Sequence, residues 1–323
     1  MRAWVSGATQ GLDGLALEDI DRPAPAEGRL LIKVDFAALN FSDILMIADR
    51  YQVRPPRPFT PGQEVAGIVE SAPEGSGWAP GDRIASKVDW GGFAEFALVR
   101  ADMAMAIPEG VDLARAVALP VVYTTAMVAL SECVTVASGD TLLVHAAAGG
   151  IGLAAVEIGK AKGARVIATA GSAEKLALAK AHGADHGIDY RDEDWVGAVR
   201  SITKGAGATV ILDPVGGKIG EDSLRCIARD GTLLIVGFAS GRIPKLAANR
   251  LLLKRAAAKG VYWNHDDDGP MLARVADQLM ELLGDGRIDP LVDDRYGLED
   301  LPEALDCLKD RRSVGKLVLR VAA

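Results

Sequence analysis

The feature that most constrains the fold is a regular alternation of strand-like and helix-like stretches between residues 141 and 264. Short apolar runs recur here with amphipathic stretches between them, which is typical of a parallel sheet joined by crossover helices. The predicted strands are TLLVHAA, RVIATA, HGIDY, TVILDPV, GTLLIVGF and KGVYWN. The predicted helices are IGLAAVEIGKAK, SAEKLALAKAH, DEDWVGAVRSIT, EDSLRCIAR and LAANRLLLKRAA, and Gly163, Gly183 and Gly205 stand where C-terminal caps are expected. This order predicts a doubly wound α/β fold.

The regions on either side have a different pattern. Before residue 120 the strand-like runs RLLIKVDFAAL, VAGIVES, DRIASKV, GGFAEFALV and MAMAIP are short and separated by turn dipeptides, which indicates a β-rich unit. After residue 265 come two helix-like runs and a last strand, GKLVLRV, too few elements for a separate core. We therefore expect a discontinuous β-rich domain, residues 1–122 with 265–323, a second domain, residues 123–264, and a cleft where they meet.

Composition excludes several classes of function. The 323-residue chain has a net charge of −8, which argues against nucleic acid as a partner. Its apolar stretches are expected to be interrupted before the roughly 18 residues of a membrane span, and the N-terminus shows no apolar signal region, so a cytoplasmic protein is predicted. Cys133, Cys226 and Cys307 lie far apart, so neither structural zinc nor disulfides are expected.

A phosphate-binding loop is predicted at Ala147–Gly152. Its sequence, AAGGIG, fits G-x-G-x-x-G with alanine at the first glycine, and it connects a predicted strand to a predicted helix. Small residues are needed here because the backbone must turn tightly and approach a pyrophosphate at the helix N-terminus. Strand, loop, helix and next strand follow within about 30 residues, which makes dinucleotide binding the favoured interpretation.

The end of the second strand indicates which dinucleotide binds. A site for NAD usually has Asp or Glu there, to bind the ribose hydroxyls. This chain has Ala170-Gly171-Ser172 instead, with Lys175 one turn into the next helix and Tyr190 at the end of the third strand. A hydroxyl and an ammonium group are suited to a 2′-phosphate, so NADPH is the predicted cofactor.

The segment NFSDILMIADRY, residues 40–51, places Asn40, Asp43 and Tyr51 on one side of a hypothetical helix. In one unbroken helix Asn40 and Tyr51 would be about 16 Å apart along the axis, too far to serve the same atom. We therefore expect a short helix capped by Ser42 or a neighbour, and a turn near Asp49 that returns Tyr51 toward the cleft. Asp43 is then a residue that complements the helix dipole rather than a catalytic acid.

Together these stretches resemble the medium-chain dehydrogenase/reductase superfamily, and within it the zinc-free, zeta-crystallin-like NADPH:quinone oxidoreductases. The resemblance covers nearly the whole chain, in the order LNFSDILMIADRYQVRPPRPFTPGQEVAGIV, GDRI, GGFAEF, ALPVVYTTA, HAAAGGIG, DPVGG, VGFASG and RRSVGKLVL. It implies a GroES-like substrate domain beside a Rossmann domain. It also implies a homodimer joined through the Rossmann sheet.

The resemblance also implies site residues. Zinc-dependent relatives carry a Cys and a G-H-E motif where this chain has Asn40 and Pro61-Gly62-Gln63-Glu64, so no metal is expected. The implied catalytic residues, bordering the nicotinamide, are Asn40, Tyr51 and Thr125. The implied cofactor-binding residues are Ala148, Gly149, Gly150, Ile151 and Gly152 at the pyrophosphate, Ser172, Lys175 and Tyr190 at the 2′-phosphate, and Phe238, Ser240, Asn264 and Lys316 elsewhere along the cofactor.

Without a metal, the acceptor must take hydride easily and stabilise its own anion. Quinones and other α,β-unsaturated carbonyls do so, and one of them is the predicted small-molecule substrate. A 2-enoyl thioester reductase stays open as an alternative, with Tyr51 as proton donor, although Asp49 stands where such relatives commonly have Gly. The phosphates of a thioester would need a basic entrance, for which Arg50, Arg54 and Arg57 are candidates. A non-catalytic crystallin-like or RNA-binding role is a further alternative.

Overall fold

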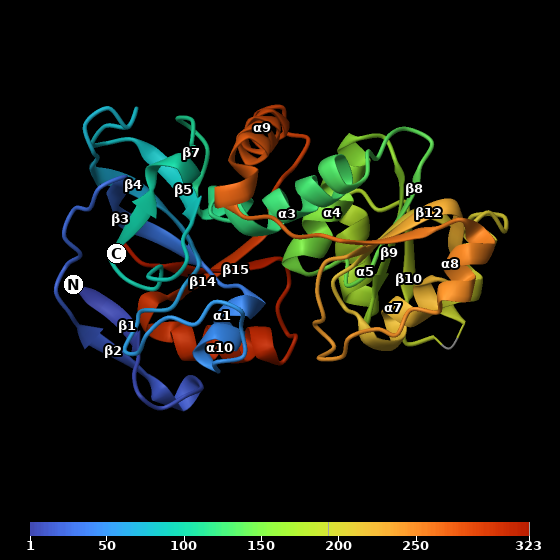
Figure 1. The fold of residues 1–323 in the computed structure, drawn as a ribbon, viewed down its shortest axis with the longest axis horizontal. Helices are drawn as coiled ribbons and strands as arrows, with labels where there is room; N and C mark the ends of the chain where they lie inside the picture. Colours follow the sequence, from blue (N-terminus) through green and yellow to red (C-terminus); the bar gives the residue numbers. More distant parts are fainter. Residues whose placement is uncertain (193, 323) are drawn as a thin grey trace. The chain divides into compact units, whose positions relative to one another are not determined.

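The computed structural model describes residues 1–192 and 194–322 and divides into two compact units. The first unit comprises Met1–Val121 and Pro290–Ala323, and the second comprises Val122–Asp289. In Figure 1 the second unit carries the colours from green to orange, and the blue and red ends of the chain belong to the first. Residues 265–289, expected in the β-rich domain, thus group with the second unit, because the long helix α9 (His265–Gly284) packs against α3 (Thr124–Met127).

The first unit is built on a sheet whose strands run in the order β14-β15-β3-β4-β5-β7, with β6 paired to β3. A separate antiparallel pair, β1-β2, completes its strands in the described chain. The strands are β1 (Arg2–Ser6), β2 (Leu15–Asp19), β3 (Arg29–Ala38), β4 (Glu64–Ser71), β5 (Arg83–Lys87), β6 (Phe96–Arg100), β7 (Met105–Ala106), β14 (Val292–Gly297) and β15 (Lys316–Arg320). Its helices are η1 (Leu12–Gly14), α1 (Phe41–Ile47), η2 (Ala101–Met103), α2 (Leu113–Ala116), η5 (Leu298–Asp300) and α10 (Leu301–Lys309).

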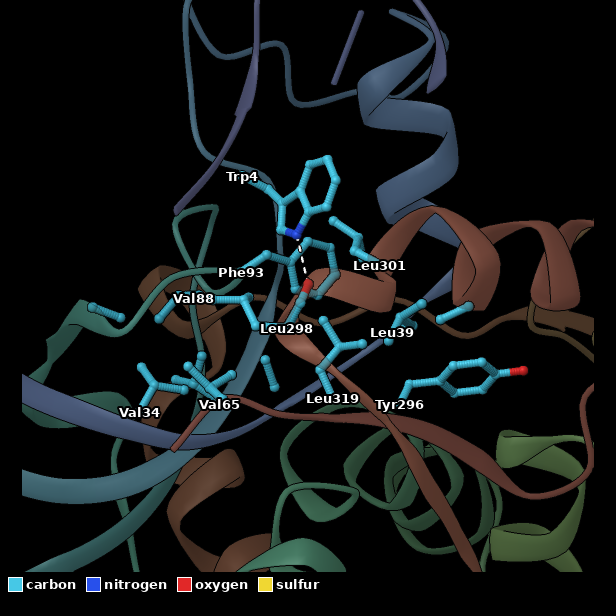
Figure 2. Packing of buried hydrophobic residues seen from close by; sticks show 14 of the residues in the cluster. Trp4, Val34, Leu39, Val65, Val88, Phe93, Tyr296, Leu298, Leu301 and Leu319 are labelled. Atoms are coloured by element: carbon cyan, nitrogen blue, oxygen red, sulfur yellow. Dashed lines mark hydrogen bonds between the residues drawn. The ribbon is translucent and has the colours of Figure 1, made fainter. Parts of the chain in front are cut away.

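The C-terminal segment forms part of the core of this first unit. Strand β15 pairs antiparallel with β3, so that Val318 faces Ala38. The indole of Trp4 donates a hydrogen bond of 2.7 Å to the carbonyl of Leu298, and Phe93 packs in the same buried cluster (Figure 2). The two ends of the chain thereby bury each other's apolar side chains, which is the main source of stability for such a unit.

The second unit is a six-stranded parallel sheet in the order β10-β9-β8-β11-β12-β13. Its strands are β8 (Thr141–Val144), β9 (Arg165–Ala170), β10 (His186–Asp189), β11 (Ala208–Asp213), β12 (Ile227–Ile235) and β13 (Ala257–Gly260). Besides α3 and α9, its helices are η4 (Val128–Cys133), α4 (Gly150–Ala161), α5 (Ala173–Ala181), α6 (Trp195–Ile202), α7 (Gly217–Ser223) and α8 (Ala248–Lys254). Figure 1 shows α4 and α8 on opposite sides of the sheet. The prediction of a doubly wound fold is confirmed, with the strand order reversing between β8 and β11.

Three predicted elements of this unit need correction. The stretch EDSLRCIAR was predicted as a helix, but α7 ends at Ser223 and Ile227 already begins β12. The last predicted strand, KGVYWN, is extended in the sheet only up to Gly260. The predicted helix DEDWVGAVRSIT begins at Trp195, and its Glu193 lies outside the described residues. The predicted glycine caps are confirmed, since Gly163, Gly183 and Gly205 all have positive φ.

One helical stretch of the described chain, Leu113–Cys133, is long and apolar enough to cross a membrane. It consists of α2, η3 (Leu119–Tyr123), α3 and η4. The prediction that every apolar stretch is interrupted earlier is therefore wrong for this segment. Since 78% of its most apolar window is buried inside the protein, packing against the rest of the chain accounts for its composition.

Candidate active site

The predicted phosphate loop connects β8 to α4. Gly149 is the N-cap residue of α4, and Gly150, Ile151 and Gly152 form its first turn. A Cβ on Gly152 would lie 2.3 Å from the carbonyl oxygen of Ala146, so only glycine allows this close approach of helix and strand. A Cβ on Gly149 would meet nothing nearer than 3.5 Å. Free N–H groups at this helix start, next to Ala148, can bind an anion.

The residues predicted to bind a 2′-phosphate lie together at the carboxyl ends of β9 and β10. The backbone N–H of Tyr190 donates to the carbonyl of Ala170 at 3.2 Å, and a Cβ on Gly171 would lie 2.8 Å from the Tyr190 hydroxyl. Ser172 is the N-cap of α5, and its Oγ accepts from the N–H of Lys175 at 3.3 Å. We call residues 146–152, 171–175 and 190 the phosphate edge. Its charge is mixed, because the exposed Glu174, which the sequence reasoning passed over, stands beside Lys175.

A buried histidine at the end of β8 holds together the elements that carry the phosphate edge. His145 directly precedes Ala146, and its ring atoms Nδ1 and Nε2 each lie 2.9 Å from a hydroxyl, Oγ1 of Thr169 and Oγ of Ser223. The Ser223 hydroxyl donates to the carbonyl of Ile219, so it accepts from His145 Nε2–H, and Thr169 donates to Nδ1. Burial lowers the pKa of His145 to about 4. The ring is therefore neutral at pH 7 and joins β8, β9 and α7.

The loop after β12, which carries the predicted cofactor residues Phe238 and Ser240, is joined by hydrogen bonds to the loop after β11. Asp213 Oδ1 accepts from the N–H groups of Val215 and Gly216 at 2.8 and 2.9 Å, and the N–H of Ser240 donates to the carbonyl of Val215. A Cβ on Gly216 would lie 2.9 Å from the ring of Phe238. Phe238 and Ser240 are thus held beside each other, and Phe238 remains 41% exposed.

Thr125 and Asn264 are each placed by a contact within the second unit. The indole Nε1 of Trp263, which the sequence reasoning did not single out, donates to Thr125 Oγ1 at 3.0 Å. Asn264 is the N-cap of α9, where its Oδ1 accepts from the N–H of Asp267 at 2.9 Å. The side-chain oxygen of Asn264 is therefore already used in a helix cap.

Asn40 and Lys316, far apart in the sequence, meet in the interior of the first unit. Lys316 Nζ lies 2.6 Å from Asn40 Oδ1 and 2.6 Å from Glu64 Oε2. Asn40 Nδ2 donates to the same Glu64 oxygen at 3.1 Å, and Asn40 N–H donates to Asp43 Oδ2 at 2.7 Å. We call Asn40, Asp43, Glu64 and Lys316 the Asn40 cluster. Sequence reasoning quoted Glu64 as part of a motif but gave it no role.

The charges in this cluster are almost completely shielded from solvent. Asn40 and Lys316 are 7% and 4% exposed, and Asp43 and Glu64 are 0% exposed. Burial raises the pKa of Asp43 to about 7, against the opposing effect of the hydrogen bond from Asn40 N–H and the positive charge of Lys316. Asp43 accepts at the third helical position of α1, so the predicted structural role at the helix start agrees with its geometry.

The segment after α1 turns as expected. Asn40, rather than Ser42, is the N-cap of α1, and Asp49 adopts a left-handed φ of 57°. The Asp49 carboxylate is held by the amide of Gln10 at 2.7 Å, so this Asp takes a conformation that glycine usually provides. Tyr51 follows the turn at intermediate exposure. Asn40 and Tyr51 belong to the first unit and Thr125 to the second, so the joint role of the three in catalysis stays a prediction.

Comparison with known proteins identifies the family. The family models described as "Alcohol dehydrogenase GroES-like domain" and "Zinc-binding dehydrogenase" match residues 26–109 and 150–281. The chain is 36% identical over 310 residues to "Quinone oxidoreductase-like protein 2" of Bos taurus, covering 94% of this chain and 88% of the bovine protein. The chain belongs to the quinone oxidoreductase family of medium-chain dehydrogenases/reductases.

Solved structures of similar proteins agree with this family. The quinone oxidoreductase of Escherichia coli, solved in complex with NADPH, has a TM-score of 0.91 at 28% identity and covers 99% of this chain and 100% of its own. The quinone oxidoreductase of Thermus thermophilus, also solved with NADPH, has a TM-score of 0.84 at 34% identity with the same coverage. The GroES-like and Rossmann architecture predicted from the sequence is thereby confirmed, and the protein is an oxidoreductase of this family.

Zinc, which the description of one matching family model names, does not fit the donor groups that this protein presents near Asn40. Gln63 and Asn40 are neutral amides, and each is already hydrogen-bonded, Gln63 Oε1 to the hydroxyl of Ser42. The Lys316 ammonium lies against Asn40 and Glu64, where it would repel a dication. Three strong Cys, His or carboxylate ligands are needed, and no such group occurs within residues 1–192 and 194–322.

Proposed function

We propose that this protein transfers hydride from NADPH to a quinone or another α,β-unsaturated carbonyl compound, without zinc. The observation that carries the proposal is the Asn40 cluster with the neighbouring Gln63, because two neutral amides, Asn40 and Gln63, and the Lys316 ammonium stand where a Lewis-acid metal would need anionic or imidazole ligands. Such a site suits an acceptor whose product anion spreads its own charge onto oxygen. Simple alcohols and ketones do not meet this condition.

NADPH is supported by the construction of the phosphate edge. The helix start at Gly149–Gly152 offers N–H groups to a pyrophosphate, and Ser172, Lys175 and Tyr190 offer two hydroxyls and an ammonium to a 2′-phosphate. The E. coli and T. thermophilus relatives were both solved with NADPH. When bound, NADPH supplies the hydride, and the protein supplies binding, orientation and electrostatics.

A 2-enoyl thioester reductase is the second candidate, favoured by one observation. The left-handed backbone at Asp49 is the turn that places Tyr51 after α1, so Asp at this position does not prevent it. Against this candidate, Arg57 contributes little to a basic entrance. Its guanidinium donates to Ser6 Oγ at 2.6 Å and to the carbonyl of Ile47 at 2.8 Å, and its side chain is only 15% exposed.

A homodimer through the second sheet is supported by its free edge. All four residues of β13, Ala257–Gly260, are exposed, and the strand pairs only with β12 among the described strands. Leu252, Leu253 and Tyr262, in or just after the neighbouring α8–β13 segment, are each more than 70% exposed. An apolar surface beside an unpaired strand edge is suited to a second copy of the chain.

The proposal is tested by following NADPH and NADH absorbance with 1,4-naphthoquinone, a simple enone and crotonyl-CoA, with and without a zinc chelator. We expect the quinone or the enone to be reduced fastest, with NADPH preferred and no effect of chelation. Tyr51→Phe separates the two candidates: it should mainly raise KM for a quinone, but lower kcat strongly if Tyr51 protonates an enoyl thioester. Saturable NADPH binding without turnover of any acceptor would overturn the proposal.

A further inference from the structure

The charges around Asn40 leave only one orientation for its side-chain amide. Lys316 ammonium can only donate, so the group facing it at 2.6 Å must be the amide oxygen. Glu64 Oε1 accepts from Val121 N–H at 2.8 Å, which fixes the carboxylate. Glu64 Oε2 can only accept, so the group of Asn40 that faces it is the amide nitrogen. The buried ion pair of Glu64 and Lys316 therefore hydrogen-bonds to both the nitrogen and the oxygen of the Asn40 amide.

In this arrangement two strong donors each keep one N–H proton that is not used in a hydrogen bond. Within residues 1–192 and 194–322, Asn40 Nδ2 uses one of its two protons, and Lys316 Nζ uses two of its three. The remaining proton on each has no acceptor in that part of the chain. Donors held rigidly in a site shielded from water are what stabilises negative charge developing on a carbonyl oxygen.

We infer that Glu64 and Lys316 are positioning residues for the proposed hydride transfer, holding the Asn40 amide so that its second N–H donates to the acceptor oxygen. This inference rests on the proposed function and goes beyond it, because that function requires only that Asn40 border the reacting groups. No proton changes place in this step: the negative charge on the acceptor oxygen is shared with the N–H donor. In this step Glu64 and Lys316 act through Asn40, and the remaining proton of Lys316 is not required.

Asp43 connects the inference to pH. Its Oδ1 is buried and has no hydrogen-bond partner among the described residues, while Glu64 of β4 and Lys316 of β15 are the charged groups that face it. An ionised Asp43 adds negative charge beside the donors and opposes charge developing on the acceptor. We therefore expect kcat to fall as pH rises through about 7, the pKa of Asp43. Asp43→Asn keeps an acceptor for the Asn40 N–H and should remove this inflection.

The main test compares Lys316→Met, Glu64→Gln and the double variant Lys316→Met/Glu64→Gln, with Arg320→Met as the matched control. Arg320 lies on the same strand, and its ion pair with Asp294 is exposed. Each single variant leaves a buried, unpaired partner and should lower the melting temperature, whereas the double variant lacks both charges of the Glu64–Lys316 pair and should recover it. We expect kcat with 1,4-naphthoquinone to stay roughly 100-fold down in the double variant, and the control to match the wild type.

A second comparison shows whether the effect runs through Asn40. Asn40→Ala should cost a large part of kcat in the wild-type background and little in the double variant, because its amide is no longer held there. Wild-type kcat in a folded double variant, or additive effects of the two changes, would overturn the inference while leaving the proposed function intact. A raised NADPH dissociation constant with unchanged kcat would overturn it too, since Lys316 would then serve cofactor binding. A wild-type protein that binds NADPH but reduces no acceptor would instead overturn both.

Discussion

The phosphate edge of the second unit and the Asn40 cluster of the first are built in different ways. The phosphate edge is mostly backbone, shaped by glycines at which a Cβ has no room and by the cap of a helix. The Asn40 cluster is mostly buried charge, held in place by side chains from three separate elements, α1, β4 and β15. The first should therefore be sensitive to added volume, and the second to changes of charge and pH.

The largest effect should come from adding one methyl group to the phosphate edge. Gly152→Ala puts a Cβ 2.3 Å from the carbonyl of Ala146, so the helix must move off the strand. We expect the free energy of unfolding to fall by about 4 kcal/mol or more, measured by urea denaturation. Gly149→Ala is the matched control, because its Cβ meets nothing closer than 3.5 Å. The control should keep its stability and lose NADPH affinity; equal losses of stability would refute the steric account.

Removing the charge of Asp43 should stabilise the first unit at alkaline pH. The folded pKa of about 7 is raised above the usual 3.8, so the folded protein holds a proton that the unfolded chain releases. Stability is therefore lost as pH rises from 3.8 to 7 and stays low above that. Asp43→Asn should raise the free energy of unfolding at pH 8 by up to about 4 kcal/mol and by little at pH 4. Equal effects at both pH values would contradict the buried-charge interpretation.

The histidine behind the phosphate edge should show the opposite pH dependence. The folded pKa of His145, about 4, is lowered from 6.5, so the unfolded chain takes up a proton first as the pH falls. The shifted pKa of His145 therefore leaves the free energy of unfolding unchanged above pH 6.5 and lowers it by up to about 3 kcal/mol at pH 4. His145→Gln, which keeps one donor and one acceptor, should flatten this acid limb in pH-dependent thermal melts. If the loss of stability at acid pH is the same in His145→Gln as in the wild type, other titrating groups must cause it.

The smallest effect concerns the choice of cofactor. Lys175→Glu places a carboxylate at the start of α5, where the 2′-phosphate is expected, and should lower the NADPH to NADH preference roughly 10- to 100-fold. Lys180→Glu, in the last turn of the same helix, is the control and should leave the preference unchanged. Competition binding of the two nucleotides measures both. Equal losses for NADPH and NADH would remove Lys175 from the 2′-phosphate site.

The same contrast explains how much could be predicted from the sequence. The phosphate edge follows from local pattern, because strand, glycine loop, helix and cap lie within one short stretch. The doubly wound fold follows from the repetition of such strand and helix units, whereas the order of the strands in the sheet comes from the structure alone. The stretch from Leu224 to Arg229 misled, because its apolar spacing also suits a helix, whereas pairing with β11 makes Ile227 the start of a strand. The β1–β2 pair was missed because neither strand shows a strong alternation on its own.

The Asn40 cluster could not be predicted as a set. Asn40 and Lys316 are 276 positions apart, and only the pairing of β15 with β3 brings the C-terminal segment back to the N-terminal one. The family resemblance implied that Asn40 borders the nicotinamide and that Lys316 lines the cofactor, but no local pattern indicates that Glu64 lies between them. The partner of Thr125, Trp263, was missed for the same reason, because 138 positions separate the two.

The central claim is that a metal-free, charge-built cluster in the first unit serves hydride transfer from NADPH. The most direct measurement is the rate of NADPH oxidation with 1,4-naphthoquinone, for the wild type and the Lys316→Met/Glu64→Gln variant, in the presence of a zinc chelator. We predict full wild-type activity under chelation and a roughly 100-fold lower kcat in the folded variant. Activity that requires added zinc, or that is equal in the two proteins, would contradict the claim.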